Sequence, residues 1–261
     1  MFVSHAWKYA FYDVVVAAME QYASKDSDAY FWFDLFTNDQ NKVAEKDFNW
    51  FSDTFRNSIK NIGKVLLILS PWDDPMPIKR AWCLFEIYQA LEENSVEFTI
   101  DLPGSQNEEL KAAVTKDSRC VIRALSDIQA ENAQAAVNSD REMIFRVIQE
   151  SEGGFSKVNQ NVKRGLRSWY INQLQLLAQQ NPDNERFLIN TGWVMKSFAF
   201  LDESLQYYTD LLSKRPADEQ EEESLAEIYN NMAIVYSDKG ELDKALEYYN
   251  KSLSIRLNTL G

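Results

Sequence analysis

The sequence contains little glycine, proline, cysteine or histidine. Of its 261 residues, 8 are Gly and 6 are Pro, which argues against a loop-rich or low-complexity chain. The two cysteines, Cys83 and Cys120, stand apart from any spaced Cys/His cluster, so the sequence fits a reducing compartment and shows no zinc signature. Because His5 is the single histidine, a His-rich metal site is excluded. We therefore expect no bound metal.

Long apolar runs and an excess of positive charge are also missing. No apolar run is long enough to span a bilayer, and the candidate Val65 to Leu69 has the length of a strand. Met1 leads directly into a strand-like segment without a basic stretch, so the sequence shows no signal peptide. The formal charge of -13 repels phosphate backbones. We expect a cytoplasmic protein that binds neither nucleic acid nor a membrane. Because a helical pattern runs almost to Gly261, we also expect a fragment of a longer protein.

Short apolar runs alternate with helical stretches over the first half of the chain. Hydrophobic residues make up 45% of the sequence, which is enough for a packed core. The strand candidates are Phe2 to His5, Tyr30 to Asp34, Val65 to Ser70, Val96 to Leu102 and Cys120 to Ala124. The helix candidates are Phe11 to Ala23, Phe48 to Asn61, Ile78 to Glu93, Asn107 to Val114, Asp140 to Glu150 and Phe155 to Gln180. This alternation predicts an α/β fold with a flavodoxin-like five-stranded parallel sheet in order 2-1-3-4-5 and helices on both faces.

The second half of the chain carries a helical repeat. Aromatic and small residues recur at helical spacing, with a glycine where two helices would meet: Tyr229, Met232, Ala233, Tyr236, Gly240, Ala245, Tyr249 and Ser252. A weaker copy lies 41 residues earlier: Leu188, Thr191, Gly192, Met195, Ala199, Ser204, Tyr208 and Leu211. This pattern is typical of tetratricopeptide repeats (TPRs), in which paired antiparallel helices stack. We predict helix pairs at residues 185–217 and 225–257, with Ala233 and Ala245 at the close contacts. The end of the second copy, Ser252 to Gly261, resembles the repeat ends of kinesin light chains.

These patterns divide the chain into an α/β domain at residues 1–126, a helical connector at 127–183 and TPR-like repeats at 184–261. TPRs bind protein partners in a groove lined by the first helix of each pair. In this sequence that helix carries Asn230, Asn231 and Ile234. We therefore expect a protein partner in the groove.

Two segments of the first domain resemble Toll/interleukin-1 receptor (TIR) domains. MFVSHAW, Met1 to Trp7, resembles the first TIR strand, in which an apolar run ends in Ser. Val65 to Leu91 resembles the stretch in which a strand ends in Ser, crosses a loop and enters a helix through Trp-Cys-Leu-x-Glu, here Trp82 to Glu86. Asp34 resembles the acidic residue that ends the second TIR strand. The resemblance covers roughly the first 125 residues.

The resemblance implies a TIR-like fold, a signalling role of the kind found in innate immunity, and self-association. Active TIR domains cleave the nicotinamide–ribose bond of NAD with a glutamate that matches Glu86, so NAD would be a substrate and no cofactor is needed. The chemistry is reasonable on general grounds, because a carboxylate can stabilise the positive charge that develops on the ribose. The predicted carboxyl ends of the strands, where ligands bind in such sheets, supply the substrate-binding candidates Ser4, His5, Trp7, Asp34, Ser70, Trp72 and Trp82.

Each of these residues also has a structural interpretation. Glu86 can be a solvated helix residue, the tryptophans can be core residues, and the serines can cap the helices that follow them. Three functions therefore stay open: an NAD glycohydrolase or cyclase controlled through the TPRs, a non-catalytic interaction scaffold, and a domain that binds another nucleotide. The third lacks both the Gly-x-Gly-x-x-Gly and the P-loop patterns. Glu86 favours the first function, whereas a loop after Asp34 without glycine favours the second.

Overall fold

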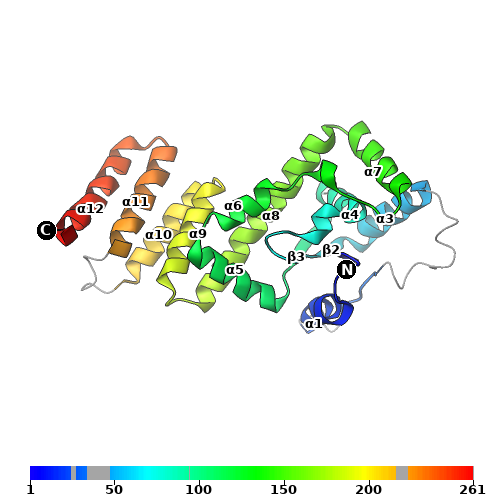
Figure 1. Ribbon diagram of the computed structural model, residues 1–261, viewed down its shortest axis with the longest axis horizontal. Coiled ribbons are helices and arrows are strands. Elements are labelled where there is room, and N and C mark those ends of the chain that lie inside the picture. Colours follow the sequence, from blue (N-terminus) through cyan, green and yellow to red (C-terminus); the bar gives the residue numbers. More distant parts are fainter. Residues whose placement is uncertain (25–27, 34–47, 94, 216–222, 261) are drawn as a thin grey trace. The chain divides into compact units, whose positions relative to one another are not determined.

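The computed structural model describes residues 1–24, 28–33, 48–93, 95–215 and 223–260 (Figure 1). The chain forms two compact units. One consists of Met1–Leu110 and Arg123–Trp169 and is called the α/β unit here; the other consists of Lys111–Ile122 and Tyr170–Gly261 and is called the helical unit. The division between them falls inside helices α5, α6 and α8, whose bounds follow.

The strands are β1 (Phe2–Ser4), β2 (Lys64–Ile68) and β3 (Glu97–Asp101). The helices are α1 (Ala17–Ala23), α3 (Phe48–Ile62), α4 (Ala81–Glu92), α5 (Gly104–Lys116), α6 (Cys120–Ser126), α7 (Asn138–Glu150), α8 (Gly154–Gln180), α9 (Glu185–Ser197), α10 (Leu201–Ser213), α11 (Glu223–Asp238) and α12 (Leu242–Leu260). A π-helical turn, Phe11–Val16, leads into α1, and 3-10 turns form at Met76–Lys79 and Ala130–Asn132.

The sheet is parallel and has the order β1-β2-β3. Val3 pairs with Leu66 of β2, and Leu66 pairs with Thr99 of β3. On the outer side of β1, Trp32 forms a single parallel bridge with Phe2, so its backbone lies alongside the first strand. From the Trp32 bridge through β1 and β2 to β3, the spatial order therefore agrees with the first four segments of the predicted strand order 2-1-3-4-5.

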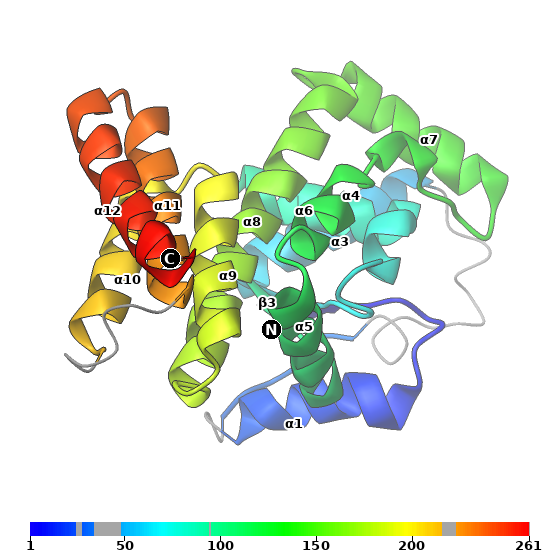
Figure 2. The ribbon, with the colours of Figure 1, turned by 60° about the vertical axis from the view of Figure 1, so that its left-hand side comes forward.

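Helices cover both faces of this sheet. Because side chains alternate along a strand, Phe2 and Ser4 point to one face and Val3 to the other. Val3 packs with Val15 and Ala18 on the π-helical turn and α1. The Phe2 ring contacts that of Phe55 on α3, with 5.9 Å between centroids. In Figures 1 and 2, α1 lies on one side of the strands, and α3 and α4 lie on the other.

The number of strands is a correction to the sequence analysis. The parts of the chain that the structure describes contain three strands instead of five. The predicted fifth strand, Cys120 to Ala124, was wrong, because these residues begin helix α6. Val121, Ala124 and Leu125 are buried there, at the spacing of one helical face. The predicted second strand is reduced to the Trp32 bridge, and its last residue, Asp34, lies outside the described residues.

The two predicted helix pairs are present, although α10 ends at Ser213 and α12 continues to Leu260, beyond the predicted end at residue 257. Helices α9 and α10 form one pair and α11 and α12 form the next, and α10 packs against α11. Ala233 and Ala245 are 0% and 3% exposed, which confirms the predicted register of the second pair. Gly240 has φ +78° at the turn between its helices, a conformation that glycine adopts without steric cost. The helices in the described parts of the chain are too short or too polar to span a bilayer.

Candidate functional site

Helix α4 places a carboxylate in the interior of the α/β unit. All residues from Cys83 to Ala90 are buried, because α4 packs against α3, α7 and strands β1 and β3. Glu86 is therefore only 7% exposed, and the Ser4 hydroxyl donates a 2.6 Å hydrogen bond to its Oε2. Ser4 ends β1 on the face that α3 and α4 cover, so strand alternation aims its side chain at Glu86. The structure brings these two candidates together at the carboxyl end of β1.

The chain that follows β1 is tied to neighbouring segments. The Cys83 thiol donates to the His5 carbonyl at 3.1 Å, and the His5 ring stacks on Phe33 with centroids 4.4 Å apart. The Tyr9 hydroxyl accepts from the Ser70 backbone N–H at 3.0 Å and donates to the Ser70 carbonyl at 2.5 Å. Burial raises the pKa of Tyr9, so this hydroxyl keeps its proton. These contacts connect the segment after β1 to the end of β2 and to α4.

A small pocket lies beside the end of β1. Its volume is about 170 Å³, and its lining residues are His5, Trp7, Tyr9, Phe11, Val15 and Phe33. Mostly aromatic walls of this kind suit a planar ring. Trp7 is 56% exposed, and the guanidinium of Arg80 lies 5.8 Å from the centroid of its ring. Neither Glu86 nor Ser4 is among the lining residues.

The other two tryptophan candidates take part in packing contacts elsewhere. Trp72 is buried, and its backbone N–H donates to Gln106 at 3.0 Å. The indole N–H of Trp82 donates to Asp140 of α7 at 3.2 Å, and its ring lies 5.5 Å from that of Phe55. Neither residue lines the pocket.

Sequence reasoning missed Tyr9, Phe11 and Phe33 as pocket residues. A usable signal was present in the alternation of aromatic residues after the first strand, Trp7, Tyr9 and Phe11. Among the described residues, no group of three or more His, Cys, Asp or Glu side chains is placed to hold a metal ion. The predicted substrate residue Asp34 lies outside the described residues.

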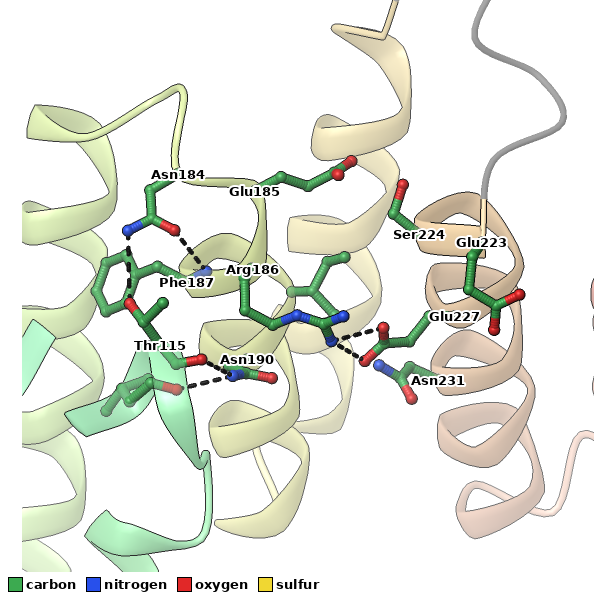
Figure 3. Close-up of polar contacts among 12 residues, drawn as sticks. Thr115, Asn184, Glu185, Arg186, Phe187, Asn190, Glu223, Ser224, Glu227 and Asn231 are labelled. Carbon is green, nitrogen blue, oxygen red and sulfur yellow. Dashed lines mark hydrogen bonds and ion pairs between the residues drawn. The ribbon is translucent and has the colours of Figure 1, made fainter. Parts of the chain in front are cut away.

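A second candidate site is the face that the first helices of the two repeats share. Figure 3 shows Arg186 of α9 reaching Glu227 of α11. Its Nη1 donates to both carboxylate oxygens, at 2.8 and 2.7 Å. The two residues are 41 positions apart, which is the period of the repeat, so they occupy equivalent places on successive helices. Slightly more than half of the Arg186 side chain is exposed.

Asparagine side chains of α9 and α11, and Asn184 just before α9, form hydrogen bonds within the helical unit. The Asn184 side chain accepts from the Phe187 N–H at 3.1 Å and thereby caps the start of α9. The Asn190 amide donates to the Val114 carbonyl at 2.7 Å, and both asparagines reach Thr115 (Figure 3). The equivalent residue of the next repeat, Asn231, is buried and donates to the Tyr208 hydroxyl at 3.2 Å. Among the three predicted groove residues, Asn230 and Ile234 are half-buried and stay accessible.

The comparisons with known proteins bear on the helical unit. Residues 226–258 match the tetratricopeptide repeat. The match covers most of α11 and α12 and indicates binding of a protein partner. No curated protein and no solved structure matches the chain. The comparisons assign no family to the α/β unit, so its resemblance to TIR domains stays a prediction.

Proposed function

We propose that the chain is an interaction protein whose TPR-like repeats bind a protein partner on the face shared by α9 and α11. The observation that carries the proposal is the pairing of two equivalent helices that keep polar groups accessible. Arg186 and Glu227 join them, and Asn230 and Ile234 lie half-buried on α11. Such a face offers a peptide both hydrogen-bonding groups and apolar contact.

To test this proposal, the purified chain is used to select binding peptides from a library of random peptides displayed on phage. We expect enriched peptides whose binding is lost in Ile234→Arg, because a charged side chain would fill the face. Gln206→Arg, on the exposed side of α10, is the matched control and should bind the same peptides as the unchanged chain. Selected peptides that bind both variants equally would contradict the assignment of this face.

A second candidate function concerns the α/β unit, which we propose to be TIR-like. The specific observation in its favour is the buried contact between Ser4 and Glu86 at the carboxyl end of a parallel strand. In this reaction the bond between nicotinamide and C1 of the ribose breaks, nicotinamide leaves with the bonding electrons, and water adds to C1 to give ADP-ribose and a proton. The Glu86 carboxylate would stabilise the cationic ribose, and the Ser4 hydroxyl would orient that carboxylate.

The aromatic pocket supports the same proposal. A planar ring such as nicotinamide would stack between residues like Trp7 and Phe33. His5 would line the pocket with them, and Ser70 would belong to a neighbouring loop. Trp72 and Trp82 would support these loops from the interior, and Asp34 stays a prediction of the sequence. Self-association of the α/β unit would provide control, with the repeats recruiting the partner that triggers it.

Release of free nicotinamide from NAD, followed over a range of protein concentrations, tests this function. Glu86→Gln keeps the shape of the side chain and should lower release by about two orders of magnitude, the effect of losing one preorganised charge. Glu97→Gln is the matched control, because Glu97 is exposed on β3 and pairs with Lys64. No release at any concentration, or equal release by the two variants, would remove the enzyme function and leave the interaction function standing.

A further inference from the structure

Helix α12 exposes a continuous stripe of large apolar side chains. Its members are Leu242 (66% exposed), Leu246 (61%), Tyr249 (39%), Leu253 (53%) and Leu257 (60%), and they are called the α12 stripe here. Spacings of three and four residues place all five on one face of the helix. They lie away from Ala245 and Ser252, which are buried. Scattered apolar side chains are ordinary on a protein surface, but an ordered stripe marks an interaction site.

The preceding repeat shows how the same residues are used. The sequence LDESLQYYTDLLSKR at 201–215 corresponds to LDKALEYYNKSLSIR at 242–256. The first four stripe residues thus correspond to identical residues of α10: Leu201, Leu205, Tyr208 and Leu212. In α10, Tyr208 and Leu205 belong to the buried core, at 0% and 9% exposed, and the partly buried Leu201 and Leu212 pack against that core. The difference between the two helices is that α11 covers α10.

Helix α11 covers α10 with a defined set of groups. Ile228, Met232 and Val235 supply the apolar contacts. Asn231 donates to the hydroxyl of Tyr208, and Lys239, just beyond the helix, pairs with Asp202. On α12, the residue equivalent to the acceptor Tyr208 is Tyr249 of the stripe, and the residue equivalent to the acceptor Asp202 is Asp243.

We propose that the α12 stripe is a docking surface for one helix of a partner protein, built like α11. That helix carries apolar residues spaced as Ile228, Met232 and Val235, an Asn that meets Tyr249 and a Lys that meets Asp243. The proposal rests on continuity with the α10–α11 interface, in which identical residues already bind such a helix. A second copy of α12 would match the leucines but would not reproduce this set of apolar and polar groups. The stripe is on a second helix of a pair, so it is distinct from the face of α9 and α11.

A synthetic peptide with the sequence of residues 223–239 is the probe, labelled with a fluorophore and titrated with the full chain. We expect saturable binding in the micromolar range, because a short peptide must become helical as it binds. Leu246→Asp and Leu253→Asp should each weaken binding at least about tenfold, since they place a charge in an apolar contact. Leu176→Asp on α8, where the leucine is 52% exposed, is the matched control and should bind normally.

Two further variants separate docking on the α12 stripe from displacement of α11. A peptide that merely displaced α11 from α10 would be insensitive to Leu246→Asp, because α11 does not cover Leu246. Exchanging the charges, with Asp243→Lys in the chain and Lys239→Glu in the peptide, should restore binding that either change alone weakens. Leu246→Asp should leave the thermal unfolding midpoint nearly unchanged because its side chain is exposed.

Four outcomes would overturn the proposal. They are absence of peptide binding, equal binding by Leu246→Asp and Leu176→Asp, a large loss of stability in Leu246→Asp, and a concentration-dependent dimer of the chain that Leu246→Asp abolishes. The last result would show that a second copy covers the stripe.

Discussion

Ser4 and Glu86 lie 82 residues apart in the sequence, yet the Ser4 hydroxyl donates a 2.6 Å hydrogen bond to the Glu86 carboxylate inside the α/β unit. A buried carboxylate is tolerated only with polar partners, because removal from water disfavours its charge. The contact therefore links the first strand to α4 and holds the carboxylate at the strand end. The contribution of this contact to stability can be measured.

Ser4→Ala should lower the free energy of unfolding by about 1–3 kcal/mol, because a buried acceptor loses a hydrogen bond. A double-mutant cycle with Glu86→Ala should give a coupling of roughly 1–2 kcal/mol, measured by urea denaturation. Ser24→Ala is the control, since the exposed Ser24 hydroxyl donates to the Gln21 carbonyl, three residues away on the same helix end. A coupling near zero would mean that the two side chains do not interact in solution.

Gly192→Ala should destabilise the helical unit although alanine normally favours a helix. A Cβ at this position would lie 2.5 Å from Cζ of the Tyr208 ring, which is fully buried and cannot move away. We expect a loss of about 1–3 kcal/mol from overpacking. Gly104→Ala, with nothing within 4 Å of the new Cβ, should be neutral or stabilising in the same thermal denaturation experiment.

The turns of the two repeats lead to a pair of predictions: alanine to glycine should stabilise the first turn, and glycine to alanine should destabilise the second. Ala199 has φ +66° at the position equivalent to Gly240, which has φ +78°. Because a Cβ is unfavourable in the left-handed region, Ala199→Gly should stabilise the protein by about 0.5–1 kcal/mol. Gly240→Ala should destabilise it by about 1 kcal/mol for the same reason. Chemical denaturation of both variants should show the two changes with opposite sign, and a shared sign would contradict the equivalence of the turns.

Stability should fall in alkaline solution through Tyr207, a half-buried tyrosine of α10. Burial raises the pKa of Tyr207 to about 12 from its usual value of 10, with a smaller opposing effect from its hydrogen bond with Thr191. The unfolded chain therefore loses this proton first, and stability that is intact below pH 10 is lost as the pH rises toward 12.

Measuring the urea midpoint of unfolding at about pH 9 and at about pH 11 checks this effect. Each proton that only the unfolded chain releases lowers the free energy of unfolding by up to about 1.4 kcal/mol per pH unit. Tyr207→Phe should reduce the alkaline loss. Tyr12→Phe is the control, because Tyr12 is 78% exposed. Equal alkaline losses in the two variants would show that Tyr207 ionises equally well in the folded state.

The helical repeats were the part most accessible to sequence reasoning. Their helices pack against neighbours in the chain, so the spacing of Ala233, Gly240 and Ala245 already specifies which faces meet. The three observed strands were also predictable, because Val65 to Leu69 and its counterparts are short apolar runs between helical patterns. The fifth strand was wrong for a related reason: Cys120 to Ala124 is too short for periodicity to separate a strand from a buried helix.

The sequence by itself determined that Glu86 follows a strand and a loop, and hence that it lies at the carboxyl end of the sheet. Only the tertiary structure decided its partner, because the contact with Ser4 requires α4 to pack on the same face of β1 to which Ser4 points. Tertiary packing also turned Trp82 toward Asp140 and left Leu246 exposed while its equivalent Leu205 is buried. Local patterns specify which face of an element is apolar, whereas the neighbour that covers that face is chosen by segments far away in the chain.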